Sequence, residues 1–272
     1  MNGIKRRWFH TKQIHIVTAV INCKRLYAQS NRKRRRLLRK IIETSTSADI
    51  ILLPAGFYEN RKMTKRRICS LAKDVTKILK RANSFSTVCL GVDYRRGKDQ
   101  IAYAINAGGI VAMGRKFYPT KGEQGAITTA ADYLSTENDM ERIFQVKGFR
   151  CYLAVCYDGF GVRHLNTSNP GVDILLNLVH CFYEKGQGCS GDVYFARKGF
   201  AGASMQWGCP VFGAAVFFGR EVSERWPTGM LYSGSKSVQA FKYTDNEMTW
   251  TERVEVAEGK ETAIIHKYMV TG

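Results

Sequence analysis

The sequence predicts a mixed α/β domain in which helices cover one or two β-sheets. Two observations predict this class. In the first half, amphipathic segments with helical spacing alternate with short apolar runs that are typical of buried strands. In the second half, strand-like segments dominate. The 272 residues contain no evident repeat, low-complexity tract or linker, so we expect a single domain spanning residues 1–272.

The first third of the chain alternates predicted strands and helices. Gln13 to Ile21 is rich in Ile and Val and predicts the first strand. Ser30 to Glu43 predicts a helix, because its apolar residues share one stripe opposite a basic face. Ile50 to Leu53 is a continuous apolar run that ends at a Pro and predicts a buried parallel strand. Lys62 to Arg81 has the apolar spacing of a second helix.

The rest of the chain predicts mainly strands. A polar turn containing Gly joins two of them into a hairpin, and residues 119–140 predict a long irregular loop. Val172 to Val179 is interrupted by polar residues, so we expect a strand there, with a short helix as the alternative. We expect a helix over Asp192–Ser204 and short alternating strands over residues 229–269. The other predicted strands are Thr87–Tyr94, Ile101–Ala107, Ile110–Met113, Arg142–Val146, Tyr152–Val155 and Val211–Phe218.

One cysteine stands at the end of a predicted strand. Cys156 closes an apolar run, and Tyr157-Asp158-Gly159 then break it. At such a junction the sulfur lies beside the next backbone amides, which can lower the pKa of a thiol and hold an oxyanion. The alternative is an inert core cysteine, because free Cys is among the most buried residue types.

Cysteine usage and the N-terminus predict a reduced, cytoplasmic protein. The eight Cys include no C-x-x-C pair, and the five His do not fall near them at zinc spacings, so we expect no metal site. Lys5-Arg6-Arg7 precedes an apolar run, as in an export signal, but that run is short and lacks a small-residue cleavage site. No segment is apolar over the roughly 18 residues that a membrane span needs.

The positive charge is confined to the first third of the chain. Residues 1–100 contain 25 Lys/Arg and 6 Asp/Glu, whereas residues 101–272 contain 17 of each, so the first third carries the whole net charge of +19. A cationic surface attracts nucleic acid or other polyanions without reading sequence. Solvated helix faces, or pairing with a partner subunit, are the alternatives. The candidate anion-binding residues are Arg32, Lys33, Arg34, Arg35, Arg36, Arg39, Lys65, Arg66 and Arg67.

Three strand-end segments, taken in order, resemble the nitrilase (carbon–nitrogen hydrolase) superfamily. They are Leu53-Pro54-Ala55, then Lys116-x-x-Pro-Thr-x-x-Glu123, and finally Cys156-Tyr157-Asp158. In that family, one strand ends in Pro-Glu, a later strand leads to Arg-Lys, and a third ends in Cys-Tyr-Asp or a variant. The resemblance extends from about Gln13 to the Gly229–Ser233 region. It implies a four-layer α-β-β-α sandwich with both basic helices in outer layers, facing solvent.

The resemblance also implies chemistry. A thiolate attacks an amide or nitrile carbon and forms a thioester, without a metal or cofactor. Cys156 would be the nucleophile, and the Lys116 ammonium would stabilise charge that develops on the substrate. Glu123 would hold Lys116 and the substrate in place, and Tyr157 would supply a backbone amide near the oxyanion. The family's small amide or nitrile substrates and its frequent dimers are implied in the same way.

One position departs from the family pattern. The family's general base directly follows Pro54, where this chain has Ala55, and alanine cannot accept a proton. Loss of a general base typically costs about 10²–10⁴ in rate. Glu59, four residues on, or Glu123 could replace it. The sequence therefore supports two hypotheses. The first is a hydrolase of small amides or nitriles that is impaired by loss of the general base or rescued by another carboxylate. The second is a non-catalytic protein of this fold that binds polyanions.

Overall fold

Strand β1 (Gln13–Cys23) joins the two halves of the fold. Its Ile and Val side chains are buried on both faces. One edge pairs along its whole length with antiparallel β13 (Glu261–Thr271). The other edge is shared, because β2 (Ile50–Leu52) pairs with Ile16–Thr18 and β10 (Val211–Phe218) pairs with Ile21–Cys23, both in parallel. Strand β1 therefore lies between the two halves of the sheet and is hydrogen-bonded to both.

The computed structural model describes residues 12–24, 29–184, 191–223, 226–233 and 241–272, so Lys5-Arg6-Arg7 and Cys189 lie outside the described residues. The described strands form one 13-stranded sheet with the main order β6-β5-β4-β2-β1-β10-β9-β8-β7. It folds over so that β5 and β6 pack against β8. The remaining bounds are β3 Tyr58–Asn60, β4 Thr87–Tyr94, β5 Asp99–Asn106, β6 Gly109–Arg115, β7 Ile143–Val146, β8 Phe149–Val155, β9 Ile174–Phe182, β11 Gly229–Met230 and β12 Glu252–Glu258.

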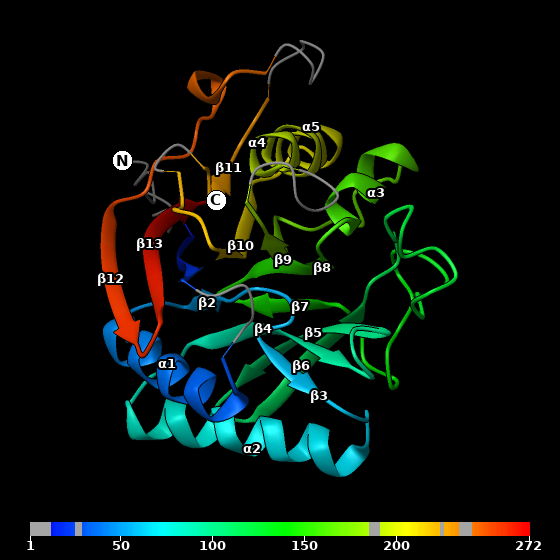
Figure 1. Ribbon diagram of the computed structural model, residues 1–272. Coiled ribbons are helices and arrows are strands. Elements are labelled where there is room, and N and C mark those ends of the chain that lie inside the picture. The colour runs from blue at the N-terminus through cyan, green and yellow to red at the C-terminus, as the bar shows by residue number, and fades with distance from the viewer. Residues whose placement is uncertain (1–11, 25–28, 185–190, 224–225, 234–240) are drawn as a thin grey trace, which may run out of the picture.

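Helices α1 (Asn31–Thr44) and α2 (Lys65–Arg81) cover one side of the sheet (Figure 1). The apolar stripe of each helix is buried in one cluster with side chains of β1, β2 and β4. Each fully buried Leu, Ile or Val contributes about 1.5–3 kcal/mol relative to exposure. Helix α2 begins at Lys65 rather than at Lys62, because the Thr64 hydroxyl accepts a hydrogen bond from the Arg67 N–H and caps the helix.

A second helical layer lies on the opposite side, at the top of Figure 1. It comprises α3 (Asp158–His164), α4 (Asp192–Phe195), a π-helical turn (Ala196–Ala201) and α5 (Gly202–Trp207). Its aromatic side chains belong to the larger core cluster, which also fills the space between the two halves of the sheet. The predicted α/β fold class with four layers is therefore confirmed. No helix among the described residues is long and apolar enough to cross a membrane.

Two local predictions differ from the structure, and one alternative that the sequence left open is decided by it. The region after Cys156 was predicted as a tight turn, but it forms helix α3. Residues 229–269 were predicted as several short strands, whereas β13 is 11 residues long because its full-length pairing with β1 holds it extended. The segment from Val172 is a strand, β9, and the helical alternative is excluded.

Arg34 differs from its expected position on a solvent-facing cationic surface. Its side chain is buried on α1, and two of its nitrogens donate to Glu261 Oε1 of β13, at 2.9 and 2.7 Å. Arg34 and Glu261 both have side chains only 1% exposed. The guanidinium also lies 5.1 Å from the centre of the Phe57 ring. The expectation that Arg34 belongs to a solvent-facing cationic surface is therefore wrong, because its side chain is buried and paired with Glu261.

Removing one member of this pair should destabilise the fold strongly. In Arg34→Met, the Glu261 carboxylate stays buried without its partner, so we expect a loss of about 3–5 kcal/mol in the free energy of unfolding. Urea denaturation measures this loss. Arg35→Met is the matched control, because the Arg35–Asp74 pair is exposed and such pairs contribute only about 0–1 kcal/mol. Equal losses in the two variants would contradict this account.

Candidate active site

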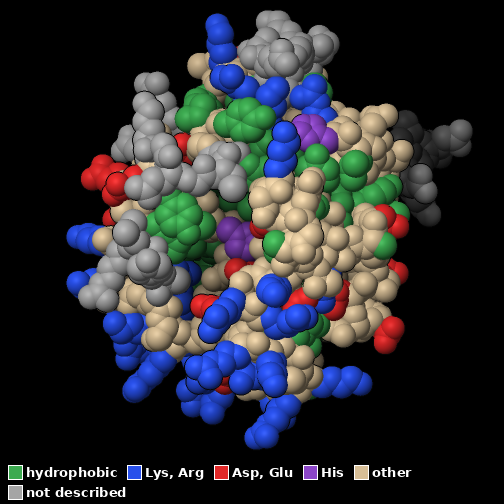
Figure 2. Space-filling view, turned by 45° about the vertical axis from the view of Figure 1, so that its right-hand side comes forward, with side chains coloured by type: hydrophobic (Ala, Val, Ile, Leu, Met, Phe, Trp, Pro, Cys, Tyr) green, Lys and Arg blue, Asp and Glu red, His purple; other side chains and the backbone are tan. Residues whose placement is uncertain are grey.

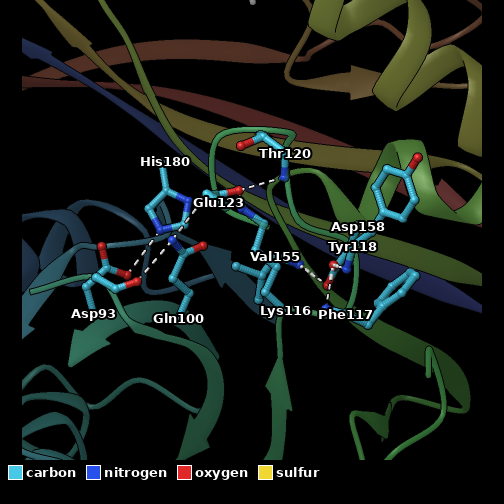
Figure 3. A network of polar contacts seen from close by, with 11 residues as sticks. Asp93, Gln100, Lys116, Phe117, Tyr118, Thr120, Glu123, Val155, Asp158 and His180 are labelled. Carbon is cyan, nitrogen blue, oxygen red and sulfur yellow. Dashed lines mark hydrogen bonds and ion pairs between the residues drawn. The ribbon is translucent and has the colours of Figure 1, made fainter. Parts of the chain in front are cut away.

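The site forms where several strands of the folded sheet end. Strand β8 ends at Val155 and is followed by Cys156, whereas β6 ends at Arg115 and is followed by Lys116. Because β6 packs against β8 across the sandwich, the segments that follow them meet. Figure 3 shows Lys116 and Glu123 on one side of this junction, and His180 and Asp93 beside them.

The buried carboxylate of Asp158 ties these two strand ends together. One oxygen accepts the backbone N–H groups of Phe117 and Tyr118, both at 2.9 Å, and the other accepts the N–H of Val155 at 2.9 Å (Figure 3). The guanidinium of Arg142 lies 3.6 Å away. Asp158, the third residue of the Cys-Tyr-Asp motif, thus fixes the position of Cys156 relative to Lys116.

Cys156 itself has a strained backbone. Its φ is +54°, in the left-handed region that costs a side-chain-bearing residue about 1–3 kcal/mol. A 2.7 Å hydrogen bond from its N–H to the carbonyl of Leu178 on β9 helps to hold this conformation. The residue is 8% exposed. Such strain is concentrated at functional sites, where it aims a side chain that an extended strand would turn away.

Lys116 and Glu123 form a buried ion pair. The Lys116 side chain is fully buried, and its ammonium lies 2.6 and 2.8 Å from the two oxygens of Glu123. Gln100 and the N–H of Thr120 also donate to this carboxylate. Burial alone would raise the pKa of Glu123, but the charge and hydrogen bonds of Lys116 outweigh it and lower the pKa to about 2. Glu123 is therefore a fixed anion.

Two cationic groups act on the thiol of Cys156. Burial opposes its ionisation, but the Lys116 ammonium and the His180 imidazole outweigh burial and lower the pKa of the thiol. The side chain and the backbone of His180 both favour the ionised sulfur. Burial also acts to lower the pKa of Lys116, but the charges of Cys156 and Glu123 outweigh burial, so the pKa of Lys116 is raised. The geometry therefore favours a thiolate within a cluster of balanced charges.

Sequence reasoning did not find His180 or Asp93. His180 lies near the end of β9, and its Nε2 is 3.1 Å from Asp93 Oδ1 on β4. Burial would lower the pKa of His180, but the charge and hydrogen bond of Asp93 outweigh it and raise the pKa to about 10. No motif marks either residue. The available signal was topological, since β9 runs parallel to β8 and brings its last residues beside Cys156.

A search of the solved structures found this fold in other proteins. An amidase of the nitrilase superfamily from Nesterenkonia AN1, crystallised as a cysteine-to-serine mutant, superposes with a TM-score of 0.57 at 12% identity, covering 78% of this chain and 81% of that chain. A double mutant of that amidase in complex with acrylamide gives 0.56 at 12% identity, over 98% and 93% of the two chains.

The fold is that of the carbon–nitrogen hydrolases.

A glutamine-dependent NAD(+) synthetase from Cytophaga hutchinsonii also superposes, with a TM-score of 0.52 at 15% identity, over 96% of this chain and 43% of that chain. Scans against protein-family models and against curated proteins found no match. At these identities the likeness concerns the carbon–nitrogen hydrolase fold alone. The assignment of residues to roles therefore depends on the geometry of this chain.

Ala55 and Glu59 border a cavity of about 900 Å³ beside His180 and Asp93. Ala55 is buried after the end of β2, and its N–H donates to the carbonyl of Val179 at 3.1 Å. Glu59 is exposed on β3, where its backbone bonds to Asn31. The electrostatic partners of the Cys156 sulfur are Lys116 and His180 rather than Glu59.

Tyr157 directly follows the nucleophile candidate in this carbon–nitrogen hydrolase fold. Its ring stacks on Phe160 with centroids 4.5 Å apart, and the Lys116 ammonium lies 5.8 Å from the ring centre. These contacts fix the peptide between Cys156 and Tyr157, whose amide is adjacent to the sulfur. Within the described part of the chain, no group of three or more His, Cys, Asp or Glu side chains is placed to hold a metal ion.

The remaining basic candidates lie away from this site. Helices α1 and α2 border a groove of about 260 Å³ that is lined by Arg32, Arg35, Arg36, Arg39 and Arg81. Lys33 is exposed on α1, and Lys65, Arg66 and Arg67 are exposed on the first turn of α2. The structure thus separates a cationic helical surface from the Cys156 cluster, which lies at the strand ends.

Replacing Asp158 by Ala should damage both the fold and the site. The buried N–H groups of Phe117 and Val155 and the partly buried N–H of Tyr118 would lose their acceptor, and loss of an acceptor costs a buried group about 1–3 kcal/mol. We therefore expect a decrease of at least about 3 kcal/mol in the free energy of unfolding, measured by urea denaturation. The variant should also lose the rapid alkylation of Cys156 by iodoacetamide. Asp132→Ala, at an exposed turn, is the control. An Asp158→Ala protein with wild-type stability and thiol reactivity would contradict the role given to Asp158.

Proposed function

We propose that the protein is a thiol-dependent hydrolase that cleaves a carbon–nitrogen bond in a small amide or nitrile. The observation that carries this proposal is the buried Lys116 ammonium, which Glu123 holds with both carboxylate oxygens and which acts on the Cys156 sulfur. A fully buried lysine beside a thiol whose pKa is lowered is unusual in a purely structural core. The Cys156 thiol and the fixed positive charge of Lys116 therefore belong to one cluster.

Each group has a part in the proposed reaction. The Cys156 thiolate attacks the carbonyl or nitrile carbon and forms a covalent adduct, which for an amide becomes a thioester once the amine leaves. Lys116 stabilises the negative charge that develops on the substrate oxygen or nitrogen. Glu123 keeps the ammonium oriented, and the amide of Tyr157 donates to the developing oxyanion. Water then releases the acyl group as a carboxylate.

The structural neighbours support this class of reaction. The Nesterenkonia amidase is described in complex with butyramide, and acrylamide adds to its active-site cysteine in another of its crystals. Those ligands are small amides. They motivate the choice of short aliphatic amides as first substrates for this protein.

Turnover of short amides tests the proposal. Acetamide, propionamide, butyramide and the matching nitriles are incubated with the protein, and ammonia release is measured. Intact-mass spectrometry follows the acyl adduct on Cys156. We expect ammonia release that Cys156→Ala abolishes and that Lys116→Met lowers by about 10²–10³, as for loss of one oxyanion donor. Cys69→Ala, at an exposed cysteine on α2, is the control and should keep full activity. Turnover that survives Cys156→Ala would reject the proposal.

The arginine groove between α1 and α2 favours a second function, the binding of polyanions. Figure 2 shows Lys and Arg side chains crowded over the lower part of the molecule, where these helices lie. Some charges are already neutralised, because Arg35 pairs with Asp74, and Arg36 and Lys40 pair with Glu258. Arg32 and Arg81 line the groove with their exposed guanidinium groups. We propose that this surface binds nucleic acid through its phosphates.

Salt-dependent binding of a labelled DNA duplex tests this second function. In Arg32→Gln/Arg39→Gln/Arg81→Gln, each phosphate contact that is lost should reduce the slope of log affinity against log salt by about 0.9. The control is Lys121→Gln/Arg150→Gln/Lys242→Gln, which removes the same charge from other exposed positions. We expect weaker binding in the first variant only. No binding near physiological salt, or equal weakening in both variants, would exclude the groove as the site.

A further inference from the structure

We propose that His180, held by Asp93, is the acid–base group of Cys156 and replaces the carboxylate that related folds carry at the position of Ala55. This inference rests on the proposed thiol chemistry and names the group that moves its protons. It makes His180 a catalytic residue and Asp93 a positioning residue. The cluster then contains Cys156, His180 and Asp93, together with Lys116, which also acts on the sulfur.

The arrangement is built from three strands of the sheet. Cys156 follows β8, His180 lies on β9 and Asp93 lies on β4. The Cys156 N–H bonds to Leu178, two residues before His180, so the imidazole and the sulfur leave neighbouring strands side by side. The Nε2 of the ring lies 3.1 Å from Asp93 Oδ1, and the ring lowers the pKa of the Cys156 thiol. Figure 3 shows the His180 ring directed at Asp93. Because Nε2 faces Asp93, the ring is oriented with Nδ1 free for the sulfur.

The carboxylates nearby are poorly suited to this task. Glu123 is held by Lys116, Gln100 and Thr120, and its lowered pKa makes it a weak base. Glu59 is exposed on β3, and its backbone is fixed by Asn31. Asp93 reaches the sulfur only through the imidazole. Among the described residues, His180 is the proton-accepting side chain that contacts Cys156.

A side chain at position 56 would collide with Asp93 and lie close to His180, and the chain has a glycine there. Gly56 has a φ of +59°, and a Cβ there would lie 2.9 Å from Asp93 Oδ2 and 3.3 Å from His180 Cδ2. The small residues at 55 and 56 also open the 900 Å³ cavity that both His180 and Asp93 line. Water from this cavity can reach the imidazole. The same local sequence that removes a carboxylate therefore makes space for its replacement.

The proposed steps balance in atoms and charge. The resting pair is a thiolate and an imidazolium. The thiolate attacks the amide carbon, and the C–N bond breaks as His180 transfers its proton to the leaving nitrogen. The neutral imidazole then takes a proton from water, whose oxygen attacks the thioester, and the C–S bond breaks to restore the thiolate and the imidazolium. The sum is one amide and one water giving one carboxylic acid and one amine, with no net change on the protein.

The charges around His180 favour its protonated state. Asp93 on β4 and the Cys156 sulfur after β8 stabilise the cation. The cavity beside His180 is also lined by Arg34, Glu59, Arg61 and Arg96, and Lys116 after β6 acts on the same sulfur. The pKa of the thiol is lowered and that of His180 is raised to about 10. The thiolate–imidazolium pair is thus present above the thiol pKa and lost as pH rises through about 10. Acylation by an amide should fall on both sides of that window.

An activated ester tests His180 without requiring carbon–nitrogen cleavage. With p-nitrophenyl acetate, the leaving group needs no proton, so the thiolate alone can become acylated. In His180→Gln, we expect a burst of p-nitrophenol followed by turnover lowered by about 10²–10⁴, as for loss of a general base. Mass spectrometry should show acetyl-Cys156 accumulating. Because loss of His180 also raises the pKa of the thiol, both proteins are compared at a pH at which their Cys156 is ionised. A merely structural role for His180 would then slow both phases together. His15→Gln, at an exposed histidine of β1, is the control.

Two further variants keep the inference testable if His180→Gln folds poorly. Asp93→Asn should also slow deacylation and shift the alkaline limb of the pH profile downward, because it removes the charge that raises the pKa of His180. Ala55→Glu should restore part of the deacylation rate in the His180→Gln background and add nothing to the wild type. Wild-type deacylation in His180→Gln or in Asp93→Asn would overturn the inference. Normal His180-dependent ester turnover without any amide turnover would instead overturn the proposed carbon–nitrogen hydrolase function alone.

Discussion

The site depends on a positive charge that is buried and must be balanced. A lysine ammonium without counter-charges in the interior would give up its proton, because burial disfavours the charged form. Lys116 keeps its charge since Glu123 and the Cys156 sulfur both act on it, and the same contacts lower the pKa values of Glu123 and of the thiol. The cation, the carboxylate and the sulfur therefore stabilise one another, and removing one would change the ionisation of the others.

Two features of the fold hold these charged groups in place without taking part in the proposed reaction: the hydrogen bonds of Asp158 and the backbone conformation of Cys156. Asp158 accepts hydrogen bonds from the end of β8 and from the segment after Lys116, and so links the two halves of the sandwich. The strained φ of Cys156 then directs the side chain. Both features have an energetic cost, a buried carboxylate and an unfavourable backbone conformation. The extensive core on either side of the sheet provides the stability that offsets it.

Sequence reasoning predicted the elements that local pattern determines and missed those that depend on distant contacts. Apolar runs identified most strands and marked Cys156 at the end of one of them. The resemblance to the nitrilase superfamily singled out Lys116 and Glu123, which the structure brings together with Cys156. His180 was missed because a histidine in an apolar strand has no motif, and only the parallel pairing of β8 and β9 brings it to Cys156. Arg34 was placed on a cationic surface because its partner, Glu261, is 227 positions away in sequence. No local pattern could have indicated either contact.

Two cationic groups, Lys116 and His180, lower the pKa of the Cys156 thiol and favour the thiolate. The most direct measurement is the ultraviolet absorbance of the thiolate, titrated with pH as the difference between the wild-type protein and Cys156→Ser. We expect an inflection below the ordinary thiol pKa of about 8.5. We also expect that the inflection moves upward when Lys116 or His180 is neutralised. An inflection at or above the ordinary value, or one that stays in place when Lys116 and His180 are neutralised, would contradict these assignments.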